Sequence, residues 1–205
     1  MAHMPTETAI RDALRRRVLA GTAGARDTVD EFWVPRSNER ADLAVIGQSM
    51  DGFEIKTERD TLRRLPRQAA AYGRLFDRCT VVVAEKHSDH AEAMLPEWWG
   101  ITTVHMNGSL TFMEMREARP NPDIEPETLV RLLWRDEAMT VLLKHGGEPD
   151  QGASRSSLWA ELLRTLTMTQ LRATVRRAIL SRDPAQARIA TRRFTPQPAS
   201  AGAGR

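Results

Sequence analysis

The 205-residue chain has few cysteines and no long apolar run, and each shortage excludes a class of protein. It contains one cysteine, Cys79, so no disulfide can form within the chain, and the apolar run around this thiol predicts a small buried side chain. No segment approaches the roughly 18 consecutive apolar residues of a membrane span, and no signal-peptide core follows the start. We therefore expect a cytoplasmic protein that makes no membrane association.

Lysine is also scarce, and the basic residues are unevenly placed. Only three of the 30 basic residues are lysines, namely Lys56, Lys86 and Lys144. In a chain that relies on arginine, a lysine can mark a position that needs a compact ammonium group. Residues 1–150 carry 20 basic and 25 acidic side chains, whereas residues 151–205 carry 10 and 2. This C-terminal excess can attract a polyanion, although a solvated arginine-rich helix surface explains it equally well.

The remaining composition is that of a globular protein. Hydrophobic residues make up 41% and charged residues 28%, so the chain can bury a core. Its length allows one full domain and a small appendage. We expect residues 1–5 to be a cloning scar or disordered, 6–118 to form an α/β domain, 119–194 a helical appendage, and 195–205 a disordered tail.

Residue periodicity predicts a sheet flanked by helices in the first part of the chain. Three alternating segments read as an antiparallel meander, and a later segment that is apolar on both faces is typical of a buried parallel strand. Asn107-Gly108 indicates a hairpin, and Pro66 implies either a kink in the helix that contains it or a late start of that helix. The expected strands are 29–34, 40–46, 52–57, 79–85, 101–106 and 109–115, and the expected helices are 6–20, 60–77 and 88–95.

The second part reads as wholly helical after a proline-containing linker. Gly146-Gly147 is placed to end the first of these helices, and Thr167 to Gln170 matches a capping box. The expected helices are 127–145, 156–166, 169–180 and 184–194.

The residues that indicate chemistry are two acids and a lysine. Glu54 and Lys56 share one face of a strand because side chains alternate, and strand pairing across the turn at 47–52 would bring Asp42 near Glu54. Two carboxylates can hold Mg²⁺ or Mn²⁺, and such an ion can polarise a phosphodiester while a lysine offsets the developing charge. An isolated Glu-x-Lys triplet, by contrast, usually belongs to a solvated strand face.

The order of these residues resembles a known superfamily. An acid, a short spacer and acid-any-lysine on adjacent strands are similar to the signature of the PD-(D/E)XK nucleases, and Gln68 to Tyr72 resembles the Gln-xxx-Tyr motif of their RecB-like branch. The wider run from residue 40 to 101 resembles a group of small bacterial proteins of the sce type within that superfamily. The proline of the signature is Ala41 here.

The resemblance implies a fold and a set of roles. The fold would be a restriction-endonuclease-like mixed β-sheet flanked by helices, here with a C-terminal all-helical appendage. Asp42 and Glu54 would bind Mg²⁺ or Mn²⁺ together with the Ile55 carbonyl, and Lys56 would be catalytic. Gln68 and Tyr72 would face DNA near the site.

Several further side chains have two interpretations each. Glu31 is either a third acid of the site or an ordinary surface carboxylate, and Glu39 is expected in a surface ion pair. Trp98-Trp99 is expected to pack in the core rather than to stack on bases. Arg172, Arg176 and Arg177, together with Arg182, form a basic stripe that either contacts DNA or is solvated.

Two functions of different kinds follow. The first is a metal-dependent deoxyribonuclease that hydrolyses phosphodiester bonds in repair, mobile-element or defence processes. The alternative is a catalytically weak nuclease-fold module that binds DNA or a partner. RNA stays open as a substrate because contacts to the 2′-hydroxyl cannot be identified from these residues. A homo-oligomer is also compatible with the sequence.

Overall fold

The computed structural model describes residues 5–20 and 27–183, which form a mixed α/β structure. Six strands build one sheet whose spatial order follows the chain order, β1 to β6. All neighbouring strands are antiparallel except β4, which runs parallel to both β3 and β5. The strands are β1 (Asp27–Trp33), β2 (Arg40–Ile46), β3 (Met50–Lys56), β4 (Arg78–Ala84), β5 (Gly100–Asn107) and β6 (Ser109–Arg116).

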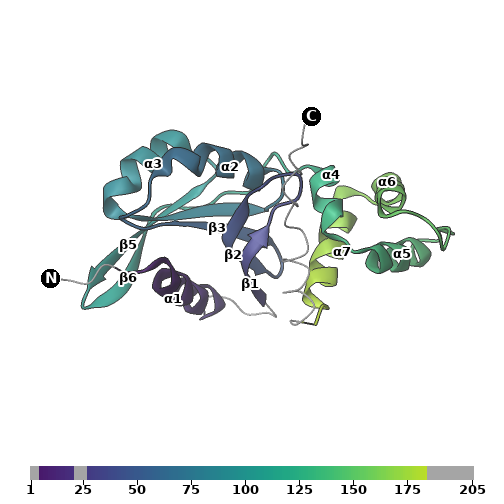
Figure 1. Cartoon of the computed structure of the whole chain (residues 1–205), viewed down its shortest axis with the longest axis horizontal. Coiled ribbons are helices and arrows are strands. Elements are labelled where there is room, and N and C mark those ends of the chain that lie inside the picture. The colour runs from purple at the N-terminus through teal and green to yellow at the C-terminus, as the bar shows by residue number, and fades with distance from the viewer. Residues whose placement is uncertain (1–4, 21–26, 184–205) are drawn as a thin grey trace, which may run out of the picture.

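Helices cover both faces of the sheet (Figure 1). The first helix, α1 (Glu7–Ala20), lies on one face, and α2 (Leu65–Gly73) and α3 (Ser88–Met94) lie on the other. The C-terminal helices gather beside one end of the sheet. They are α4 (Pro126–Leu129), α5 (Arg135–Lys144), α6 (Arg155–Thr165) and α7 (Met168–Leu180), and short 3₁₀ turns occupy η1 (Leu62–Arg64), η2 (Glu85–His87) and η3 (Val130–Leu132).

The expected α/β architecture is therefore confirmed: a mixed sheet flanked by helices with a helical C-terminal part. The antiparallel meander, the buried parallel strand and the last hairpin all form as the periodicity predicts. Pro66 stands in the first turn of α2, where its missing N–H costs no helical hydrogen bond, so the late start is the alternative that forms. Gly108 adopts the left-handed φ of 75° at the hairpin turn.

One helix prediction is wrong. The expected helix over 127–145 is divided into α4, η3 and α5, because Leu133 and Trp134 have extended backbone. The break is held from a distance: Arg182 donates to the Leu132 carbonyl at 2.5 Å and to Glu137 at 2.8 Å. Glu137 in turn accepts from the Trp134 N–H at 2.7 Å, which starts α5. The contact joins residues 45 or more positions apart, so local periodicity could not reveal it.

Some predictions fall outside the described residues. They are the helix over 184–194, the disordered tail over 195–205, and residues 1–4 of the suspected scar. Among the described helices, none is both long enough and apolar enough to cross a membrane.

Two apolar clusters hold the sheet. The smaller lies under α1 and contains Ile10 and Leu14 with Leu43 and Ile55 from the sheet. The larger lies under α2 and α3 and continues without a break into the C-terminal helices, which contribute buried leucines, valine and isoleucine from α4 to α7. The C-terminal helices thus share the core of the sheet instead of forming a separate one.

The larger cluster also settles two sequence expectations, for Cys79 and Trp99. Cys79 is fully buried, as expected, and burial raises the pKa of its thiol well above the ordinary value. Trp99 is fully buried and stacks on Tyr72 with ring centroids 5.8 Å apart, so it belongs to the core. Gly52 on β3 leaves room for the Phe76 ring, since a Cβ atom there would lie 2.6 Å from it.

Candidate active site

The site lies where two neighbouring strands stop pairing. The β2–β3 ladder runs from Ile46 opposite Met50 to Leu43 opposite Phe53. Beyond that point β2 continues beside β1 and β3 continues beside β4, which leaves a fork in the sheet. A pocket of about 470 Å³ occupies this region. It is lined by Glu7, Glu31, Trp33, Asn38, Arg40, Asp42, Glu54, Ile55, Lys56, Asp60, Arg64 and Gln68.

Asp42 bridges the fork. Its Oδ2 accepts a hydrogen bond from the Ile55 backbone N–H at 2.6 Å, so the carboxylate takes the place of a strand carbonyl. Burial raises the pKa of Asp42, the nearby charges of Glu54 and Glu7 raise it further, and the Ile55 hydrogen bond and Lys56 oppose the shift. The resulting pKa is about 7. This carboxyl therefore changes charge near neutral pH.

Glu54 is the centre of a buried hydrogen-bond network. The side chain is 1% exposed, and its Oε1 lies 2.5 Å from both Lys56 Nζ and Gln68 Nε2. Its Oε2 accepts from the Tyr72 hydroxyl, which also lies 2.5 Å from the Arg40 carbonyl. Burial and the Glu54 charge raise the pKa of the Tyr72 phenol well above its ordinary value, so the hydroxyl stays protonated.

The resemblance implied that Gln68 and Tyr72 face DNA, and the structure places both beside Glu54, with Gln68 in the lining of the pocket. Both side chains are buried, at 2% and 0% exposure, and their polar groups contact Glu54. Their hydrogen bonds hold the Glu54 carboxylate in place. Lys56 is where the sequence predicted it, beside Glu54 and on the wall of the pocket, and it is 7% exposed.

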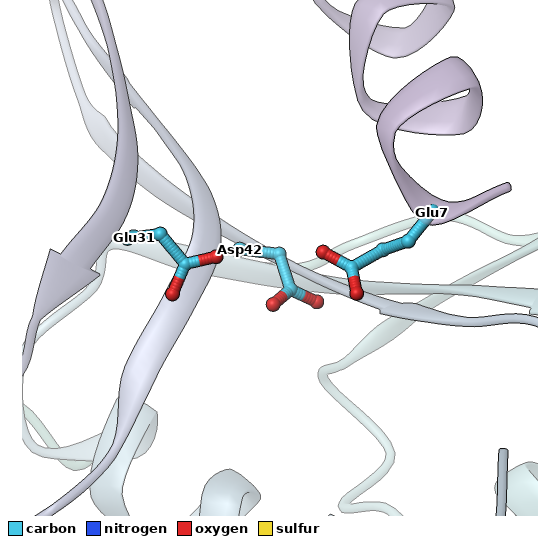
Figure 2. A group of neighbouring side chains, drawn as sticks. All are labelled: Glu7, Glu31 and Asp42. Atoms are coloured by element: carbon cyan, nitrogen blue, oxygen red, sulfur yellow. The ribbon is translucent and has the colours of Figure 1, made fainter.

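Three carboxylates converge next to this network. Ligand oxygens of Glu7, Glu31 and Asp42 all lie within 4.8 Å of one another. In Figure 2 the Glu31 and Glu7 side chains approach from opposite sides and Asp42 lies between them. Glu31 thus lies beside Asp42, and its side chain is also 48% exposed and paired with Arg11, so both of its interpretations stay open. Glu54 is not one of these three residues, and its two oxygens contact Lys56, Gln68 and Tyr72.

A kink in β1 brings Glu31 to the cluster. Its φ is 51°, a left-handed value that costs a non-glycine residue about 1 kcal/mol or more. Side chains on a regular strand alternate, yet the consecutive Asp30 and Glu31 both contact α1, through Arg15 and Arg11. The kink also lets Val29 and Phe32 point into the same core. The backbone strain therefore positions a carboxylate.

Arg11 links two acids of the cluster. Its Nη2 atom contacts Glu7 one turn away and Glu31 across the gap to β1, the latter at 3.0 Å. These contacts fix the first turn of α1 against the sheet.

Glu7 is the site residue that sequence reasoning missed. A usable signal existed, because Glu7 precedes Ile10 and Leu14 by three and seven positions and so shares the core-facing side of α1. A carboxylate on that side needs a partner or a function.

Glu39 differs from its expected place. It was expected on the surface beside Arg40, but its side chain is 2% exposed. It pairs with Arg64 at 3.0 Å and Arg67 at 2.6 Å, both around the start of α2. The ion pairing is confirmed and the surface position is wrong, because the chain after β1 turns Glu39 under the two arginines.

The C-terminal arginines do not form one stripe. Arg172 and Arg176 lie within 4 Å of the Asp77 carboxylate, whereas Arg177 lines a different pocket between α5 and α7. Asp77 in turn contacts the Met50 N–H at the start of β3, and Lys56 ends that strand. Six residues separate the two points, or about 20 Å at 3.3 Å per residue.

The pKa of Asp42 predicts a pH dependence of stability in the metal-free protein. An acid whose folded pKa lies above its unfolded value stabilises the fold less as pH rises, here between about 4 and 7. From pH 5 to 7 this group alone should lower the free energy of unfolding by about 2 kcal/mol. Urea denaturation in EDTA should show that loss in the wild type, and Asp42→Asn should lack it. Equal pH slopes for the two proteins would contradict the shift.

The chain is thus a mixed α/β protein with an acidic pocket and a buried lysine at a fork in its sheet. The family model described as "Bacteriophage P4 protein cII" matches residues 7–197, and the chain belongs to this family. It is similar to "Protein cII" of Enterobacteria phage P4, with 26% identity over 119 residues, covering 58% of this chain and 45% of that protein. The chain therefore matches less than half the length of this relative. No solved structure matched the chain.

Proposed function

We propose that this protein is a divalent-cation-dependent nuclease that hydrolyses phosphodiester bonds in DNA. The observation that carries the proposal is one pocket that is lined both by the Glu54–Lys56 ion pair and by the acids Glu7, Glu31 and Asp42. The motif order from Asp42 to Tyr72, which resembles the PD-(D/E)XK nucleases, supports the same chemistry.

The charge of the pocket supports a bound cation. Its lining has five carboxylates, Glu7, Glu31, Asp42, Glu54 and Asp60, against three basic side chains. Such a pocket repels a phosphodiester unless a cation enters with it. Hard oxygen ligands of this kind suit Mg²⁺ or Mn²⁺, with substrate phosphate completing the shell.

A second feature of the pocket points to a ligand. The Oε1 atom of Gln68 is buried and has no hydrogen-bond partner among the described residues, although Gln68 lines the pocket. A buried acceptor without a partner is costly, so a bound water, cation or substrate donor would stabilise it. The carboxylate oxygens of Glu7, Glu31 and Asp42 fit a divalent ion, and the unpartnered Gln68 oxygen in the same pocket supports a bound ligand there.

Each side chain has a distinct role in the proposed reaction. When bound, a divalent cation supplies Lewis acidity for the phosphodiester. Lys56 places its ammonium at the pocket wall, where it offsets negative charge that develops during hydrolysis. Glu54 fixes that ammonium at 2.5 Å, and Gln68 and Tyr72 fix Glu54. The lysine is thus preorganised before substrate arrives.

Membership in a family described by a bacteriophage protein supports the mobile-element setting over repair or defence. The preference for DNA rests on the nuclease resemblance, and RNA is tested beside it.

The decisive assay compares cleavage of labelled single-stranded, duplex and branched DNA, and of RNA, in Mg²⁺, Mn²⁺ or EDTA. We expect cation-dependent cutting by the wild type, a loss of about 10²-fold or more in Asp42→Asn, and no loss in the exposed control Asp89→Asn. If the wild type binds these substrates but cuts none of them, the nuclease proposal fails and the binding module replaces it.

A further inference from the structure

A second pocket lies at the opposite end of β3 from the acids. It measures about 290 Å³ and lies between the strand ends and helix α7. Three arginines line it: Arg78 at the start of β4, and Arg172 and Arg176 on α7. The pocket has one carboxylate, Asp77, so its lining is basic where that of the first pocket is acidic.

Within residues 5–20 and 27–183, most of the hydrogen-bonding capacity of these arginines is unused. Asp77 accepts the Met50 N–H at 2.7 Å, and it lies 3.5 Å from Arg172 Nε and 3.8 Å from Arg176 Nη1. Those distances are attractive for charges but too long for strong hydrogen bonds. Arg172 Nε is buried without a hydrogen-bond partner in the described part of the chain. Asp77 therefore holds the two guanidinium groups in place and leaves their donors available.

Arg78 is the least constrained of the three. Its side chain is exposed, and residues 5–20 and 27–183 supply it with no hydrogen bond or ion pair. Three cations around one carboxylate create a net positive pocket, and guanidinium groups bind phosphate oxygens through paired N–H donors. A cluster of three guanidinium groups with available donors fits a phosphate group.

We propose that Arg78, Arg172 and Arg176 form a binding site for a backbone phosphate of nucleic acid, about 20 Å along β3 from the acidic pocket. The choice of nucleic acid as the source of the phosphate rests on the proposed nuclease function. The site supplies affinity and orientation, because phosphate contacts fix position without reading sequence. It also gives the acidic pocket, which repels DNA, a basic counterpart that attracts it.

The test measures DNA binding without cleavage. Fluorescence anisotropy of a labelled duplex in EDTA is compared for the wild type, Arg78→Gln and the double variant Arg172→Gln/Arg176→Gln. We expect the DNA affinity to fall about threefold in Arg78→Gln and about tenfold or more in the double variant. The slope of log affinity against log salt concentration should become shallower by about 0.9 for each lost phosphate contact. Arg177→Gln is the matched control, since this residue is on the same helix but lines another pocket.

Two readouts separate this proposal from the nuclease proposal. Mn²⁺ affinity by calorimetry should be unchanged in the arginine variants, and the binding losses should appear whether or not the wild type cuts DNA. Arg78→Gln removes no intramolecular partner within the described residues, so it tests the site even if the double variant unfolds.

Two results overturn the proposal. The first is that Arg78→Gln does not differ from its reference: either its DNA affinity and salt slope equal those of the wild type, or the Arg177→Gln control loses as much DNA affinity. The other is micromolar binding of inorganic phosphate that depends on Arg78 while duplex binding does not, which would assign the pocket to a small phosphate compound.

Discussion

Replacing Lys56 by alanine is expected to lower cation-dependent cleavage by about 10²-fold or more while changing DNA affinity by less than about tenfold. Lys56 lines the acidic pocket, and its Nζ lies 2.5 Å from Glu54 Oε1, so the ammonium group is preorganised before the reaction begins. An interaction that strengthens as charge develops lowers the barrier more than it improves substrate binding. Single-turnover cleavage and anisotropy measure the two effects separately.

Two further lysine variants make the result specific. Lys56→Arg should rescue poorly, because a planar guanidinium is larger than the ammonium that fits between Glu54 and the pocket. Lys86→Ala, an exposed lysine on η2, should cleave like the wild type. A Lys56→Ala protein that folds normally and cuts at the wild-type rate would remove Lys56 from the chemistry.

Replacing Glu54 by alanine is expected to lower the free energy of unfolding by about 3–5 kcal/mol. The substitution leaves Lys56 buried without its counter-ion and removes the acceptor for the Gln68 and Tyr72 donors. Buried polar groups without partners carry their full desolvation cost. Urea unfolding at pH 7 measures the loss.

Glu92→Ala is the matched control for this prediction. Glu92 is exposed and forms a 3.8 Å surface ion pair with Arg116, so its removal should cost between 0 and about 1 kcal/mol. Similar losses in the two variants would show that the buried network contributes no more than a surface pair. Because Glu54→Ala affects the fold, cation binding is better examined at Asp42.

Local patterns predicted most of the sheet domain because they report on local structure. Alternation in 40–46 and the two-sided apolar run after Cys79 are properties of single strands, and both strands formed as predicted. The prediction of one helix over 127–145 failed because Arg182, which follows the end of α7, hydrogen-bonds to residues on both sides of the break. Periodicity carries no information about such a partner.

The same distinction applies to the site. Asp42, Glu54 and Lys56 lie on two adjacent strands, so a linear motif could predict that they are close together. Glu7 reaches Asp42 only because α1 packs across the sheet, and Glu31 only because β1 kinks at a φ of 51°. The burial of Gln68 and Tyr72 depends on how closely α2 approaches β3. These are consequences of packing, which a linear motif does not encode.

The contacts of Arg11 change what cation binding means for this protein. One guanidinium already pairs with both Glu7 and Glu31, two of the three acids of the cluster, so the proposed divalent ion would compete with Arg11 for them. The affinity for that ion would then reflect the difference between two interactions of these acids, one with the ion and one with Arg11. Arg11 belongs to α1, so the same competition would loosen the first turn of that helix from β1 and couple occupancy of the site to the docking of its N-terminal helix.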